Sequence, residues 1–349
     1  IRADKVEEVM HNNLNWDEFA DATIRLLVQP EKDDPVLIIA DTSNNIVLAE
    51  SFLAAAIRYG ADAQLIIKPR SAPGMATKPG PILSNAFKSA KYIVSICDDG
   101  FDASQAIQEA ISNGTRILIT KVDGIEKYIL RAILDVDIDT MIENANLCSK
   151  LWESTKICKV TCPNGTDISF NLSPRKSIIG DGALSRDGEI DFFPGAQVNI
   201  APVEETINGT VVVDGSDNVN GLVLTPYKMT LKKGVITKIE GDSEGNKIKE
   251  WLEACNQENI YHLCHFTIGL NPEAGISGNL VEDERKVAAV DFGFGYQSSD
   301  LGGTVGPCDY HMDVVISSPS IFLDGNEMSG RGKFNSKMGF KNMVKPRSH

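Results

Sequence analysis

The sequence of 349 residues is poor in histidine and in long apolar runs. It contains five histidines, and no apolar stretch reaches the ~20 residues that a bilayer-spanning helix needs. The residues from Ile1 to Glu8 are largely charged and lack the apolar core of a signal peptide. We therefore expect a cytoplasmic protein without a membrane as a partner.

Positive charge and paired cysteines are also scarce. The formal net charge of −14 repels polyphosphate and argues against nucleic acid as a general partner. The seven cysteines form an odd set without the paired spacing of zinc fingers, so reduced thiols are the simplest interpretation. Hydrophobic residues make up 42% and charged residues 23%, as in a globular protein, and the length indicates two domains.

The two halves of the chain show different patterns of apolar residues, and these patterns predict the fold class. Apolar runs at 36–40, 63–67, 92–96 and 116–120 alternate with helical periods at 46–59 and 103–112, and an amphipathic helix pair at 5–14 and 16–28 precedes them. Continuous apolar strands separated by helices predict a Rossmann-like α/β domain with a mostly parallel sheet. After a helix at 139–154 the pattern changes to strands and turns, with a hairpin over 158–172 and a helix near 245–254.

The predicted domains follow from this change in the pattern of apolar residues. We expect an α/β domain over 1–145, a mixed α+β, strand-rich metal-binding domain over 146–329, and a basic tail over 330–349. The first predicted strand is followed by Asp41-Thr42-Ser43-Asn44-Asn45 and not by Gly-x-Gly-x-x-Gly, which disfavours dinucleotide binding. Residues at the carboxyl ends of the parallel strands could still contribute to a site, because ligands of open α/β sheets bind there.

Two histidines and an aspartate are the most informative residues. His311 and Asp313 lie two apart in an extended, β-branched segment, so both point to one face of a strand. His265 lies in a second strand-like segment, where Leu263, His265 and Thr267 alternate onto one face. Two imidazoles and one carboxylate around one ion leave positions open, which suits non-haem Fe(II) chemistry.

Two alternatives to an iron site stay open at this point. Each histidine could be a core residue that is bonded to backbone. Cys264 and Cys308 flank the predicted ligands and could bind zinc instead, although Cys264 is expected to point away from His265 on a strand.

Several stretches resemble one superfamily, which contains the aminopeptidase T-type metallopeptidases and the 2,5-dihydroxypyridine 5,6-dioxygenases. The resemblance covers essentially the whole chain in order of elements, and its sharpest motifs lie in the second half. They are Gly195-Ala196-Gln197-Val198-Asn199-Ile200-Ala201-Pro202, Asn208-Gly209-Thr210-Val211-Val212, His265-Phe266-Thr267-Ile268-Gly269-Leu270-Asn271-Pro272 and His311-Met312-Asp313-Val314.

The ligand set implied by the resemblance favours the dioxygenase branch. The peptidases carry carboxylates and a histidine where this chain has Gln197, His265 and Asp291, and those exchanges remove the anionic bridges of a two-metal site. The dioxygenases bind one Fe(II) through a histidine before the Gly-x-Asn-Pro turn and a closing His-x-Asp, which His265, His311 and Asp313 match. The resemblance thus implies extradiol-like opening of a hydroxylated N-heteroaromatic ring, with O₂ as the second substrate.

The chain departs from the dioxygenases in the residues expected around the substrate. The loops 97–102 and 190–195 contain no histidine, so an acid/base role would pass to His262, Asp99, Asp102, Glu189 or Asp291. Phe192 and Phe193 could stack on an aromatic ring, with Gln197 also in contact with the substrate, although burial in a core is the commoner fate of such a phenylalanine pair.

Three functional hypotheses remain: the ring-cleaving dioxygenase, a metallopeptidase with diverged ligands, and a non-catalytic binder of a small acid or heteroaromatic. Family resemblance also implies a homodimer or an assembly of dimers.

Overall fold

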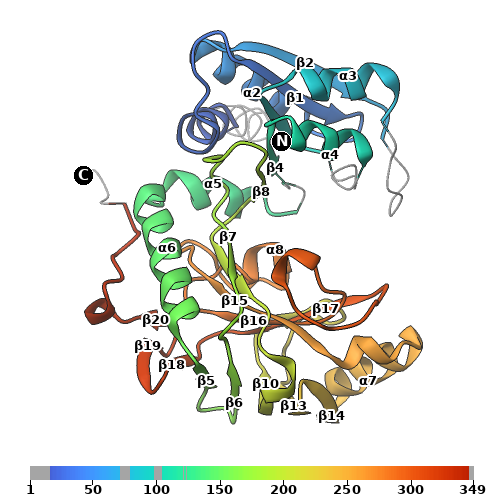
Figure 1. The fold of residues 1–349 in the computed structure, drawn as a ribbon, viewed down its shortest axis with the longest axis vertical. Helices are drawn as coiled ribbons and strands as arrows, with labels where there is room; N and C mark the ends of the chain where they lie inside the picture. Colours follow the sequence, from blue (N-terminus) through green and yellow to red (C-terminus); the bar gives the residue numbers. More distant parts are fainter. Residues whose placement is uncertain (1–15, 71–78, 98–103, 121, 123, 346–349) are drawn as a thin grey trace, which may run out of the picture. The chain divides into compact units, whose positions relative to one another are not determined.

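The computed structural model describes residues 16–70, 79–97, 104–120, 122 and 124–345, and it divides the chain into two compact units (Figure 1). The first unit consists of Ile1–Leu134 and Asp181–Gly195, and the second of Asp135–Gly180 and Ala196–His349. Within the described residues, no helix is both long and apolar enough to cross a bilayer.

The first unit is built on a five-stranded parallel sheet with the order β2-β1-β3-β4-β8. The predicted apolar runs form its first four strands, and the fifth was not foreseen. The strands are β1 (Pro35–Asp41), β2 (Asp62–Lys68), β3 (Tyr92–Ser95), β4 (Arg116–Thr120) and β8 (Ile190–Phe193). The α/β class predicted for this part of the chain is confirmed.

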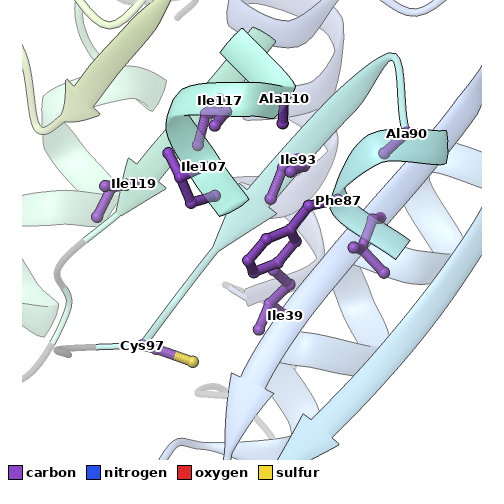
Figure 2. Close-up of a cluster of buried hydrophobic side chains, with 10 residues drawn as sticks. Ile39, Phe87, Ala90, Ile93, Cys97, Ile107, Ala110, Ile117 and Ile119 are labelled. Atoms are coloured by element: carbon purple, nitrogen blue, oxygen red, sulfur yellow. The ribbon is translucent and has the colours of Figure 1, made fainter. Parts of the chain in front are cut away.

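Helices cover this sheet and bury its apolar residues. Phe87 and Ile107 pack against Ile39, Ile93 and Ile117 of the sheet in a cluster of fully buried side chains (Figure 2). The side chains of Asn45 and Ser104 cap two helix N-termini by accepting backbone N–H groups, as their residue types favour. The helices are η1 (Ile24–Val28), α2 (Ile46–Arg58), α3 (Pro81–Ser89), α4 (Gln105–Ser112) and α5 (Glu126–Leu134). Residues 16–28 are helical as expected, whereas the helix predicted over 5–14 lies outside the described residues.

The second unit contains two antiparallel sheets. An eight-stranded sheet has the order β14-β13-β10-β6-β5-β18-β19-β20. Its strands are β5 (Ile157–Thr161), β6 (Asp167–Asn171), β10 (Asn208–Val213), β13 (Tyr227–Lys232), β14 (Val235–Glu240), β18 (Ser320–Leu323), β19 (Asn326–Gly330) and β20 (Lys333–Phe334). The hairpin predicted over 158–172 is the β5–β6 pair.

The seven-stranded sheet has the order β12-β11-β17-β16-β15-β9-β7. Its strands are β7 (Ser177–Gly180), β9 (Gln197–Ile200), β11 (Ser216–Asp217), β12 (Gly221–Leu222), β15 (Leu263–Gly269), β16 (Val290–Gly295) and β17 (His311–Ile316). Helical segments of this unit are α6 (Ile138–Ser154), α7 (Ser243–Cys255) and α8 (Leu280–Asp283), with short 3₁₀ turns η3 (Glu204–Thr206), η4 (Glu258–Tyr261), η5 (Ser299–Leu301) and η6 (Ser336–Met338).

An aromatic cluster joins these layers. Phe266 of β15 stacks on Trp152 of α6 at 4.7 Å between ring centroids, and Phe170 of β6 lies 5.0 Å from the same Phe266 ring. Side chains alternate along a strand, so Phe266 and His265 point to opposite faces of the seven-stranded sheet. One face of this sheet therefore packs in the core, and the opposite face carries the side chain of His265.

The two units differ from the domains expected from the sequence. Helix α6 lies wholly in the second unit, because Trp152 packs in its core, so the division falls at 134 and not near 145. Residues 181–195 return to the first unit, where β8 pairs with β4. The expected tail from 330 is not separate either: β20 extends the eight-stranded sheet, and Val344 bridges to Val136.

Candidate metal centre

Three adjacent strands bring the predicted ligands together. His265 on β15 lies opposite Gly293 on β16, and Gly293 in turn lies opposite Asp313 on β17. His311 is two residues before Asp313 on β17, opposite Gly295. As residues i and i+2 of a strand share a face, all three side chains lie on the face away from the aromatic core.

The three ligand atoms face one another at nearly equal distances. The Nε2 atoms of His265 and His311 are 3.1 Å apart, and Oδ1 of Asp313 lies 3.2 Å and 2.9 Å from them respectively. Ligands on one face of an octahedron at ~2.1 Å from an ion are separated by about 3.0 Å, whereas tetrahedral ligands at that distance are about 3.4 Å apart. The spacing fits a facial set around one cation.

Contacts behind the rings orient both histidines. The Tyr296 carbonyl oxygen can only accept, so Nδ1 of His311, 2.9 Å away, is the donor. The Thr267 hydroxyl donates to Asn199 Oδ1 at 2.6 Å, which leaves its oxygen to accept from Nδ1 of His265 at 3.0 Å. With Nδ1 protonated in both rings, each Nε2 faces the carboxylate of Asp313: it donates to that carboxylate while the ring is charged, and it offers a lone pair to a cation once the proton is lost. Partners of this kind are typical of metal-ligating histidines.

The electrostatics of the site match this geometry. Burial acts to raise the pKa of Asp313, but hydrogen bonds with His265 and His311 outweigh it and hold the pKa well below its usual range. Burial acts to lower the pKa of His311, yet the hydrogen bond with Asp313 raises it overall. The carboxylate is thus held ionised and attracts positive charge, which a divalent cation would supply.

Gly293 makes room for the site. A Cβ at this position would lie 2.1 Å from Nε2 of His265, far inside a van der Waals contact. The imidazole therefore lies over the bare backbone of β16 and reaches toward Asp313 on the next strand. No sequence motif marks this glycine, because its role depends on which residues pair with it across the sheet.

Asp291 is a second carboxylate, beside that of Asp313. It is 1% exposed, both of its oxygens lack a hydrogen-bond partner within the described part of the chain, and Oδ2 lies 3.7 Å from Nδ1 of His265. Burial, reinforced by the charge of Asp313, raises its pKa well above the usual range. The acid/base role predicted for Asp291 stays a prediction.

Cys264 lies closer to the site than strand alternation predicts. The register of β15 against β16 shifts between Leu263 and His265, and this bulge places the Cys264 sulfur 3.9 Å from Nδ1 of His311. The expectation that Cys264 points away is therefore wrong. Its sulfur contacts the ring on the side opposite to Nε2, and burial keeps the thiol neutral by raising its pKa. A thiol must lose its proton before it can bind a cation.

The remaining predicted acid/base residues are not members of the set formed by His265, His311 and Asp313. Asp99 and Asp102 lie outside the described residues. Two groups of side chains in the described ranges could hold a cation: Cys264 with His265 and His311, and His265 with Asp291 and Asp313. His262 caps η4 and lies in neither group. Glu189, in the first unit, forms an ion pair with Arg186 at 2.6 Å.

The two phenylalanines belong to β8 of the first unit. Phe193 is 1% exposed and packs 5.9 Å from Phe19, so it is a core residue and not a stacking surface for a ligand. Phe192 is 39% exposed, and its predicted contact with the substrate remains a prediction.

Gln197 belongs to the face that carries the ligands. It pairs with Gly269 at the end of β15, and its side-chain amide donates to Glu284 Oε2 at 3.0 Å. The sequence did not single out Glu284 as a site residue, because it lies in a run of charged residues, 282–286, that is typical of a solvent-exposed turn.

A chain with this two-unit fold and a facial His-His-Asp set is a candidate mononuclear metalloprotein. The sequence profile of the family described as 2,5-dihydroxypyridine 5,6-dioxygenase matches residues 26–336. The chain belongs to this family, which confirms the resemblance noted above.

Comparison with individual proteins agrees with this assignment. The chain is 23% identical over 234 residues to a curated 2,5-dihydroxypyridine 5,6-dioxygenase from Pseudomonas putida KT2440; the match covers 62% of this chain and 63% of that relative, which is under two thirds of its length. The solved 2,5-dihydroxypyridine dioxygenase structure from Pseudomonas putida KT2440 has a TM-score of 0.77 at 18% identity, covering 93% of this chain and 98% of that one. Wild-type AmpT from Thermus thermophilus has a TM-score of 0.64 at 15% identity, with coverage of 92% and 98%. These structural similarities establish the fold.

Proposed function

We propose that this protein is an Fe(II)-dependent dioxygenase that opens the ring of a hydroxylated N-heteroaromatic compound such as 2,5-dihydroxypyridine. The family assignment supports the reaction class and the named ring. The observation that carries the proposal is the set of three oriented donor atoms about 3 Å apart, two imidazole nitrogens and one carboxylate oxygen. O₂ as second substrate, a homodimeric assembly and a cytoplasmic location stay predictions.

In this proposal, Nε2 of His265, Nε2 of His311 and the carboxylate of Asp313 hold the ion. Fe(II) bound there would supply electron transfer between the ring and O₂. The protein's own contribution is orientation: Thr267 and the Tyr296 carbonyl fix the imidazoles, and the Asn218 side chain accepts the backbone N–H of Asp313. Two neutral rings and one carboxylate leave a bound divalent ion with low net positive charge, which favours donation of electron density from the substrate.

A two-metal peptidase is the second candidate, because AmpT shares the fold. The ligand types argue against it. Two cations a few ångströms apart need bridging anionic oxygens, whereas this chain has the amide of Gln197 and the imidazole of His265 at positions where the resemblance implies carboxylates.

The experiment is metal analysis and O₂ uptake with anaerobically purified protein reconstituted with Fe(II). We expect one iron per chain and consumption of one O₂ per 2,5-dihydroxypyridine opened. His265→Ala and His311→Ala should lose both the iron and the O₂ uptake. His262→Ala, which removes a nearby histidine outside the donor set, should keep its iron and is the matched control for metal binding.

Two other outcomes would contradict the proposal. Hydrolysis of dipeptides by protein with two Zn²⁺, Co²⁺ or Mn²⁺ per chain would identify a peptidase. Iron well below one per chain, together with ring binding that is unaffected by His265→Ala, would identify a non-catalytic binder.

A further inference from the structure

Glu284 lies beside the end of the strand that carries His265. It follows α8, and its neighbour Arg285 accepts the backbone N–H of Asn271 at 2.8 Å through its carbonyl oxygen. The backbone of this segment lies so close to the end of β15 that a Cβ on Gly269 would be 2.6 Å from the Glu284 carbonyl oxygen. Gly269 and His265 share a face of β15, so Glu284 is placed on the side of the sheet where the ligands lie.

The carboxyl group of Glu284 has one occupied and one available oxygen. Gln197 Nε2 lies 3.0 Å and Arg285 Nη1 2.6 Å from the same atom, Oε2. Among contacts within the described part of the chain, none engages Oε1. The side chain is 14% exposed, so the group is sheltered but accessible.

The charges of the metal centre act on this group. Burial and, to a smaller extent, the negative charge of Asp313 raise the pKa of Glu284 to about 7, against the lowering effects of Arg285, Gln197 and His311. The negative charges of Asp313 and Glu284 both raise the pKa of Asp291 in turn. The charged or titratable groups that act on Glu284 are thus Arg285, Asp291, His311 and Asp313. A carboxyl group with a pKa near neutral can both take and return a proton.

No other acid/base candidate from the sequence combines these properties within the described residues. Glu189 is paired with Arg186 in the first unit. Asp291 is 1% exposed, so its carboxyl group is less accessible to a substrate than that of Glu284. His262 is not part of the cluster.

We propose that Glu284, held by Gln197 and Arg285, is the proton acceptor for the ring hydroxyl of the substrate, an inference that rests on the proposed function. When the substrate binds, the O–H bond of the hydroxyl breaks, the electron pair stays on the ring oxygen, and the proton moves to Oε1 of Glu284. The same carboxylic acid can return the proton after the ring has opened, so the group is unchanged over a cycle.

The test compares Glu284→Gln with Glu258→Gln, an exposed carboxylate of the same unit, in Fe(II)-loaded protein with 2,5-dihydroxypyridine and O₂. We expect both variants to keep one iron per chain. The turnover rate of Glu284→Gln should fall about 100-fold or more, and the variant should lose the rise of the rate with pH through neutrality that we expect of the wild type. Glu284→Asp should recover part of the rate, and Glu258→Gln should match the wild type.

Each contrary result has a distinct meaning. If Glu284→Gln turns over within about threefold of the wild type with the same pH profile, the role of Glu284 is refuted and the proposed function stands. If Glu284→Gln loses its iron, Glu284 serves the assembly of the site and the inference is likewise overturned. If the wild type consumes no O₂ with the ring, both the proposed function and this inference fail.

Discussion

Gly293→Ala is the substitution that most sharply tests how the sheet builds the metal centre. The added Cβ would lie 2.1 Å from Nε2, 2.4 Å from Cδ2 and 2.5 Å from Cε1 of His265. Carbon contacts are ~3.5 Å or longer, so the ring must move by more than ~1 Å. Metal–ligand distances tolerate about 0.2 Å, so His265 would cease to be a ligand.

The expected effect is on metal binding more than on folding. Loss of a group that hydrogen-bonds to a metal ligand typically lowers the metal affinity about 10–100-fold. Displacement of the ligand itself should therefore weaken Fe(II) binding by more than about 100-fold. The backbone at Gly293 does not have a positive φ, so alanine adds no backbone strain, and overpacking should cost about 1–3 kcal/mol of unfolding free energy.

The assay is anaerobic Fe(II) titration beside a thermal melt. Gly275→Ala is the control, because a Cβ there meets its nearest neighbour at 3.4 Å, an ordinary contact. A Gly293→Ala protein that is folded and binds Fe(II) within about threefold of the wild type would refute the placement of His265 over this glycine.

Three further predictions concern the surroundings of the site and the stability of each unit. Thr267→Val keeps the volume but removes the partner of His265 Nδ1, so Fe(II) affinity in the same titration should fall about 10–100-fold; unchanged affinity would show that this contact does not orient the ring. Asn144→Ala removes two hydrogen bonds to the Lys341 backbone, of 2.9 Å and 3.0 Å, and should destabilise the C-terminal segment by about 2 kcal/mol, measured as faster limited proteolysis there than in the wild type. Burial raises the pKa of Asp191 to about 7, whereas an unfolded aspartate titrates near ~3.9. The folded state therefore retains a proton that the unfolded state has lost, and the contribution of Asp191 to stability declines as pH rises from about 4 to about 7. Melting temperatures across this range should fall less steeply in Asp191→Asn, and an identical slope would contradict the assignment.

Much of the fold could be predicted from the sequence, because the local residue patterns agree with the tertiary structure. The apolar run at 36–40 lies within β1, and the predicted helix at 139–154 matches α6 to within one residue at its start. β8 escaped prediction because Ile190–Phe193 is four residues long and joins a sheet whose other strands end seventy residues earlier. Its pairing with β4 depends on a chain return that no local pattern records.

The site was predictable in its ligands and not in its surroundings. His311 and Asp313 share a strand, so alternation alone places them together. His265 was predicted from a second strand-like segment, and the resemblance supports its place in the set. Gly293 and Glu284 depend on strand register and on packing between segments that are distant along the chain. Cys264 shows the limit of alternation, since one bulge in β15 moved its sulfur toward His311.

The most direct measurement is anomalous diffraction at the iron edge from crystals of the protein loaded anaerobically with Fe(II). A single peak about 2.1 Å from Nε2 of His265 and Nε2 of His311, and at a similar distance from the Asp313 carboxylate, is the predicted result. Absence of a peak between these three side chains, or a pair of peaks bridged by carboxylates, would contradict the one-ion centre.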